Sequence, residues 1–168
     1  MARIRPGLCN GMQDNDTILV LGLGNRLLRD DAAGPLAVEQ LAASSASPRA
    51  LFRDGGTIGL HLLPEIEQAR AFIAVDAAAF GAAPGTVRVF EGAAMDRQLG
   101  GRKRSAHEVA LFDLMATALL NDRLPPQRAL VAVEPQSTEL GLEPTPAVAA
   151  SIPRLCAEVQ ALLQRWTC

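Results

Sequence analysis

The stretch TILVLGLGN at residues 17–25 decides the fold class of this chain. Its first seven residues are almost wholly apolar and rich in branched side chains, which is typical of a strand buried on both faces of a sheet. Gly24-Asn25 ends the strand, and apolar residues at helical spacing begin at Gly34-Pro35. We therefore predict that residues 17–23 form the central strand and that a helix follows it.

Strand and helix patterns alternate along the rest of the chain. Further strands are predicted at residues 50–53, 71–75, 86–90 (an edge strand) and 128–133. Further helices are predicted at residues 60–66, 106–121 (with Ser105 as N-cap) and 147–166 (with a kink at Pro153). Residues 91–105 are polar and Gly-rich, so we predict a long loop there that is functional or mobile. This alternation predicts an α/β fold, with a mainly parallel sheet covered by helices on both faces.

Length and composition predict one globular domain. The 168 residues include 16 basic and 18 acidic side chains, so the net charge of -2 gives no strong field for nucleic acid or an anionic membrane. No segment is apolar over the roughly 20 residues that a membrane helix needs. The cysteines Cys9, Cys156 and Cys168 have neither metal-site spacing nor the pattern of a disulfide framework. We expect a monomeric cytoplasmic protein with a flexible leader at 1–16 and a single domain at 17–168.

Polar residues follow the predicted strands at the carboxyl edge of the sheet, where open α/β sheets bind their ligands. Asp31 follows the first strand, Asp76 ends the third, and His107 begins a later helix. Alone, each has an ordinary explanation as a cap or a strand end, but together they form an O,O,N donor set that suits a borderline divalent cation. For Asp30 we predict only a favourable place before a helix, and for His61 no role in the site.

Two glycine-containing turns at the same edge are candidate substrate-binding elements. Gly24 and Asn25 indicate a tight turn with a close backbone approach. The cluster Asp54-Gly55-Gly56-Thr57 has the composition of an ordinary turn, although its position also suits backbone capture of an extended peptide. Gly22-Leu23-Gly24 begins a dinucleotide-binding pattern, but Leu27 stands where the third glycine is needed. No Ser-His-Asp or Cys-His arrangement is visible.

These residues, in this order, resemble the nickel-iron hydrogenase maturation endopeptidases over roughly residues 17–165. The matching segments are LVLGLGNRLLRDDAAG at 19–34, DGGTIGLHLL at 54–63, AVDA at 74–77, SAHE at 105–108 and GLEPTPAV at 141–148. The three metal-contacting positions of the family fall on Asp31, Asp76 and His107. Position 31 is Asp where some members have Glu, which shortens the side chain by one methylene but retains the donor type.

The resemblance implies a three-layer α/β fold with a twisted five-stranded sheet. It also implies a protease that removes the C-terminal extension of a hydrogenase large-subunit precursor after nickel insertion, with Asp31, Asp76 and His107 as catalytic and metal-contacting residues. The expected metal is nickel carried by the substrate, with no organic cofactor. Because no nucleophile is evident, a non-cleaving assembly chaperone that binds the nickel-loaded subunit is the alternative, and a nucleotide-binding protein is the least favoured reading.

Overall fold

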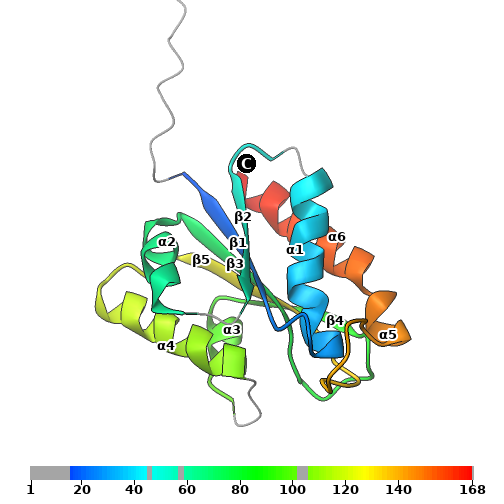
Figure 1. The fold of residues 1–168 in the computed structure, drawn as a ribbon. Coiled ribbons are helices and arrows are strands. Elements are labelled where there is room, and N and C mark those ends of the chain that lie inside the picture. Colours follow the sequence, from blue (N-terminus) through cyan, green and yellow to red (C-terminus); the bar gives the residue numbers. More distant parts are fainter. Residues whose placement is uncertain (1–15, 45–46, 57–58, 102–105, 168) are drawn as a thin grey trace, which may run out of the picture.

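The structure, a computed structural model, describes residues 16–44, 47–56, 59–101 and 106–167. The predicted fold class is confirmed: a mainly parallel, five-stranded sheet lies between two layers of helices (Figure 1). The strands are β1 Ile18–Leu23, β2 Ala50–Gly56, β3 Ala71–Ala77, β4 Val87–Glu91 and β5 Gln127–Val133. The α-helices are α1 Ala33–Ser44, α2 Leu63–Gln68, α3 Ala93–Leu99, α4 Ala106–Leu120, α5 Pro146–Ala149 and α6 Ile152–Thr167. Two short 3-10 helices are η1 Arg29–Ala32 and η2 Leu60–Leu62.

The strands are ordered β2-β1-β3-β5-β4. β1 pairs in parallel with β2 and β3, and β3 pairs in parallel with β5. β4 runs antiparallel to β5 at the edge of the sheet, which confirms the predicted edge strand. The prediction that residues 17–23 form the central strand is wrong, because β3 occupies the middle position. Both β1 and β3 are buried along their whole length, so their apolar runs alone do not distinguish the two positions.

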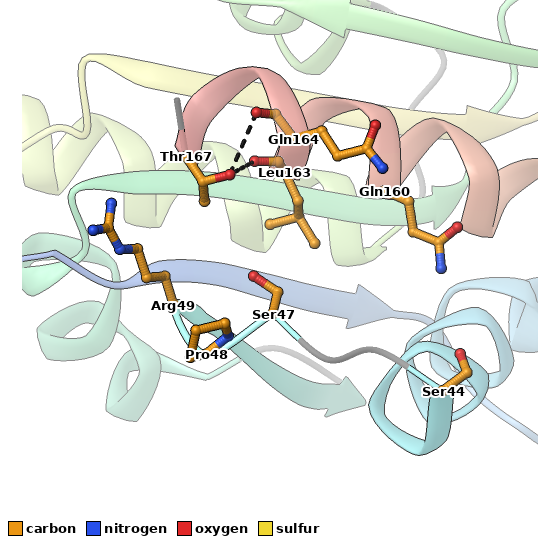
Figure 2. Close-up of a pocket in the computed structure, with 8 residues that line it drawn as sticks. All are labelled: Ser44, Ser47, Pro48, Arg49, Gln160, Leu163, Gln164 and Thr167. Atoms are coloured by element: carbon orange, nitrogen blue, oxygen red, sulfur yellow. Dashed lines mark hydrogen bonds between the residues drawn. The ribbon is translucent and has the colours of Figure 1, made fainter.

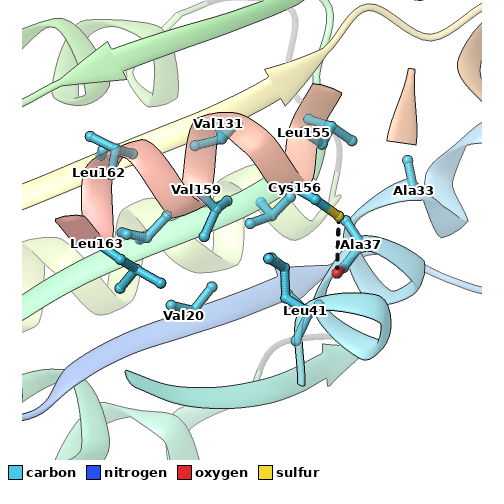
Figure 3. Close-up of a cluster of buried hydrophobic side chains, with 14 of the residues drawn as sticks. Val20, Ala33, Ala37, Leu41, Val131, Leu155, Cys156, Val159, Leu162 and Leu163 are labelled. Atoms are coloured by element: carbon cyan, nitrogen blue, oxygen red, sulfur yellow. Dashed lines mark hydrogen bonds between the residues drawn. The ribbon is translucent and has the colours of Figure 1, made fainter. Parts of the chain in front are cut away.

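The helices form one layer on each face of the sheet. α1 and α6 pack together on one face, and α2, α3 and α4 pack on the other (Figure 1). Figure 3 shows the core on the α1 and α6 side, where Val159 and Leu162 of α6 lie beside Val20 and Val131 of the sheet. Within the described segments, no helix is both long enough and apolar enough to cross a membrane.

Several predicted boundaries differ from the structure: the strand predicted at 50–53 extends to Gly56, and the helix predicted at 60–66 is divided into η2 and α2. Helix α3 lies inside the predicted loop 91–105; it buries Met95 and Leu99, four positions apart, but the surrounding glycines obscure so short a pattern. The predicted closing helix is divided into α5 and α6, and the break precedes Pro153, which lies in the first turn of α6. Ser105 and residues 1–15 of the predicted leader lie outside the described residues.

Close backbone packing fixes the start of α1 against the end of β1. A Cβ atom placed on Gly34 would lie 2.3 Å from the carbonyl oxygens of both Leu23 and Val75. A Cβ atom on Gly22 would lie 2.6 Å from the Gly34 oxygen. Only glycine allows this approach, and η1, which carries Asp31, is the connection that runs between these two positions.

We predict that Gly34→Ala lowers the free energy of unfolding by about 1–3 kcal/mol or more, because the clashing atoms are backbone and cannot rotate away. Chemical denaturation measures this difference. Ala42→Ser, on the exposed surface of the same helix, is the control and should change stability by less than about 0.5 kcal/mol. Equal stability of the two variants would show that a methyl group fits at position 34 without a clash.

Candidate active site

Asp31 and His107 form a buried hydrogen bond at the carboxyl edge of the sheet. The Asp31 Oδ2 atom lies 3.0 Å from His107 Nε2. Asp31 belongs to η1, which follows β1, and His107 lies in the first turn of α4 on the opposite helix layer. Two predicted site residues that are 76 positions apart in the sequence are therefore in direct contact.

The turn after β1 holds Asp31 in place. The Asn25 amide donates a hydrogen bond of 2.7 Å to the same Oδ2 atom that contacts His107. Gly24 has φ +131°, and a Cβ atom there would lie 1.7 Å from the Asp31 carbonyl oxygen. The structure thus shows Gly24 and Asn25, predicted to bind substrate, as direct neighbours and supports of Asp31.

Asp76 is a fully buried carboxylate at the end of β3, with 0% of its surface exposed. Among the described residues neither of its oxygens has a side-chain or backbone partner with hydrogen-bond geometry. Burial raises the pKa of Asp76 well above its ordinary value, and the charges of Glu108 and Asp31 raise it further, against a weaker opposing effect of the Ala77 amide. Asp76 is therefore close enough to Asp31 for their charges to interact.

Glu108 is a member of this cluster that the sequence analysis did not select. It follows His107 directly and is buried, and its charge raises the pKa of Asp76 more than the charge of Asp31 does. The sequence motif SAHE contains it, but a glutamate in the first turn of a helix usually has a simple explanation in the helix dipole. In the described part of the chain, no three His, Cys, Asp or Glu side chains are grouped closely enough to hold a metal ion by themselves.

The second predicted substrate-binding turn lies at the end of β2. The Asp54 carboxylate accepts hydrogen bonds from the Arg26 guanidinium at 3.1 and 3.2 Å and from the Gly56 amide at 3.0 Å. The Gly24 amide donates to the Gly56 carbonyl at 3.3 Å, which joins this turn to the turn after β1. Gly55 packs over the Leu21 side chain. Thr57 lies outside the described residues.

Asp30 has a more specific role than the position before a helix that the sequence predicted. Its buried carboxylate accepts hydrogen bonds from the amides of Gln136, Ser137 and Thr145 at 2.6–2.8 Å and from the Thr145 hydroxyl at 2.9 Å. Burial alone would raise the pKa of Asp30. The hydrogen bonds from these donors together outweigh the effect of burial, so the pKa is lowered. We call this set of contacts the Asp30 clamp; it ties the connection between β5 and α5 to η1.

A large cavity lies at the amino ends of the strands, at the opposite end of the sheet from Asp31. Figure 2 shows this cavity of about 500 Å³ between the residues that precede β2 and the last turns of α6. Its walls include Ser47, Arg49, Gln160 and Thr167. None of the predicted site residues lines it, so the candidate active site is defined by its side chains and not by this cavity.

Comparisons with known proteins identify the family. A family model described as hydrogenase maturation protease matches residues 35–162. The chain belongs to the hydrogenase maturation proteases. It is 37% identical over 153 residues to the hydrogenase expression/formation protein HupD of Rhodobacter capsulatus, a match that covers 90% of this chain and 73% of that protein. It is 34% identical over 149 residues to the hydrogenase 2 maturation protease of Escherichia coli strain K12, covering 88% of this chain and 90% of that protein.

A solved structure supports the same assignment. The hydrogenase maturating endopeptidase HybD from E. coli matches this hydrogenase maturation protease with a TM-score of 0.84 and 32% identity, covering 89% of this chain and 93% of that chain. Other relatives are longer: the match covers only 59% of HoxM from Azotobacter vinelandii. The predicted enzyme class, a hydrolase of the endopeptidase type, is confirmed by these matches. The family match includes Asp76 and His107 and begins four residues after Asp31.

The raised pKa of Asp76 should make this hydrogenase maturation protease less stable at neutral pH than at acidic pH. Because the pKa of Asp76 is raised in the folded state, the unfolded state loses the proton first, and stability falls as the pH rises above about 4. Asp76→Asn removes this cost, so its free energy of unfolding at pH 7 should exceed that of the parent. The gain should shrink as the pH falls through about 4, below which both states of the parent hold the proton.

Denaturation curves at several pH values between 4 and 8, without added metal, test this expectation. Asp113→Asn, which alters an exposed acid on α4, is the control and should follow the parent at every pH. A parent and an Asp76→Asn variant of equal stability across this range would contradict the raised pKa.

Proposed function

We propose that this chain is a nickel-dependent endopeptidase that removes the C-terminal extension of a nickel-iron hydrogenase large-subunit precursor after nickel insertion. Membership of the hydrogenase maturation proteases supports the reaction class. The observation that carries the assignment to a site is the Asp31–His107 hydrogen bond, together with the buried Asp76 carboxylate, whose pKa the charge of Asp31 raises. We place the reaction in the cytoplasm, where a reduced thiol such as that of buried Cys156 is the ordinary state.

In this proposal the Asp31–His107 pair acts on the attacking water. When the Nε2 proton of His107 donates to Asp31, the lone pair of the imidazole lies on Nδ1, where it accepts a proton from water. The carboxylate fixes the orientation and the tautomer of the ring. Water is the proposed nucleophile because Cys156, the free cysteine among the described residues, is buried on the α6 side and contacts the Ala37 carbonyl.

Asp76 is proposed to contact the substrate. Its raised pKa favours the protonated form, which donates a hydrogen bond to a carbonyl oxygen or a proton to the departing amine. In the ionised form, its two unpartnered oxygens would suit a cation. The protonation state of Asp76 would therefore depend on whether the substrate brings a positive metal ion into the site.

The residues fit a nickel ion that the substrate carries. Carboxylate oxygens are donors that a borderline divalent cation accepts, and Asp31 and Asp76 would supply them, while His107, whose free lone pair acts on water, would orient Asp31 through Nε2. Since no three such side chains among the described residues are grouped so that they could hold a metal ion, the substrate would supply most of the ligands. Affinity for the precursor would then depend on nickel, and cleavage would follow only after insertion.

Incubation of the protein with nickel-loaded precursor should release a short C-terminal peptide, detected as a loss of mass in the precursor. Metal-free precursor should remain intact, because the ligands of the ion contribute to binding. Equal cleavage of both forms would refute the dependence on nickel. Stable binding of the loaded precursor without any loss of mass would favour a non-cleaving assembly chaperone.

Variants test the site separately. Asp31→Ala, Asp76→Ala and His107→Ala should each lower the rate constant for cleavage at least 100-fold, because each removes a proton-transfer or substrate-contacting group. His61→Ala is the matched control, since His61 is exposed on η2, and it should retain the rate within about twofold. Retained cleavage in the three site variants would place the active site elsewhere while leaving the family assignment intact.

A further inference from the structure

Exposed leucines are gathered beside the candidate active site. Leu27, Leu140 and Leu142 have 55%, 81% and 77% of their surface exposed. Leu27 lies four residues before Asp31 on the turn after β1, and the other two lie on the connection between β5 and α5. Figure 1 shows this connection, drawn in orange, passing beside the blue start of α1. We call the three side chains the leucine strip.

Backbone hydrogen bonds join the two segments that carry the strip. The Gly141 amide donates to the Leu27 carbonyl, and the Arg29 amide donates to the Gly141 carbonyl, both at 2.9 Å. Leu28 and Gly141 thereby form a parallel bridge. A Cβ atom at position 141 would lie 2.8 Å from the Arg29 side chain, so the glycine permits this approach. The leucine strip is therefore carried by two aligned segments and not by two independent loops.

The Asp30 clamp, and not a hydrophobic core, holds the strip in position. Residues 135–144 bury no side chain, so no apolar packing of their own fixes them. Instead, the Asp30 carboxylate accepts hydrogen bonds from the amides of Gln136, Ser137 and Thr145, which lie at the two ends of this segment. A surface that is ordered before its partner arrives loses little conformational entropy on binding.

We infer that the leucine strip binds an extended, apolar stretch of the precursor polypeptide close to the scissile bond. The inference rests on the proposed function, because it takes the partner to be the protein that is cleaved. The strip adjoins the site: Leu27 lies four residues before Asp31, and the turn between them is closed by a hydrogen bond of 2.9 Å from the Asp31 amide to the Leu28 carbonyl. Apolar side chains of the partner would bury these leucines, which favours binding without any change in the fold.

Kinetics with nickel-loaded precursor test the inference. The double variant Leu140→Ser/Leu142→Ser should raise KM about tenfold or more, because two apolar contacts are lost, and it should leave kcat within about twofold. Substitution of exposed leucines has little effect on stability, so the variant should fold as the parent does. Leu120→Ser is the matched control: Leu120 is 85% exposed at the last position of α4, and its substitution should change neither constant.

Direct binding of the precursor to the same variants distinguishes failure of this inference from failure of the proposed function. If the parent protein cleaves the precursor and the double variant has unchanged KM and affinity, the strip is not the docking surface and the function stands. If the parent binds without cleaving, a tenfold weaker affinity of the double variant still supports the strip. If the parent does not bind the precursor at all, both proposals are refuted. A change in oligomeric state with unchanged precursor affinity would mean that the strip contacts a second copy of this chain.

Discussion

The buried hydrogen bond between Asp31 and His107 is the contact on which the site depends. It connects a 3-10 turn that precedes α1 with the first turn of α4, so it joins the two helix layers at the edge of the sheet. The bond can form only because β1 and α1 approach closely at Gly22 and Gly34, which sets the path of the chain between them. A backbone constraint in the core thus determines the geometry of two buried side chains at the carboxyl ends of the strands.

Most of the fold was predictable from the sequence because its signals are local. The apolar runs of β1, β3 and β5, the alternation in β4 and the helical spacing of α4 each indicated an element of the right type. The order of the strands was not predictable in the same way. β1 and β3 are both completely buried, and which of them is central depends on crossovers that leave no mark in an apolar run.

The candidate site was predictable in part, from the rule that ligands of such sheets bind at the carboxyl ends of strands. That rule selected Asp31 and His107, which the structure places in contact, and Asp76, whose charge interacts with that of Asp31. It did not reveal Glu108 or the Asp30 clamp. The sequence shows adjacent acids at 30 and 31, but it does not show their different partners. In the structure Asp30 binds amides within residues 136–145, and Asp31 contacts His107.

The segment between β5 and α5 has a consequence for how related proteases can diverge. Because residues 135–144 contribute nothing to the hydrophobic interior, their exposed side chains are free to vary without loss of folding stability, provided that Gly141 and the clamp remain. Natural selection can thus remodel the face offered to a client protein while the chemistry a few residues away stays the same. Such a separation would let one scaffold serve several enzymes by exchanging a short surface loop.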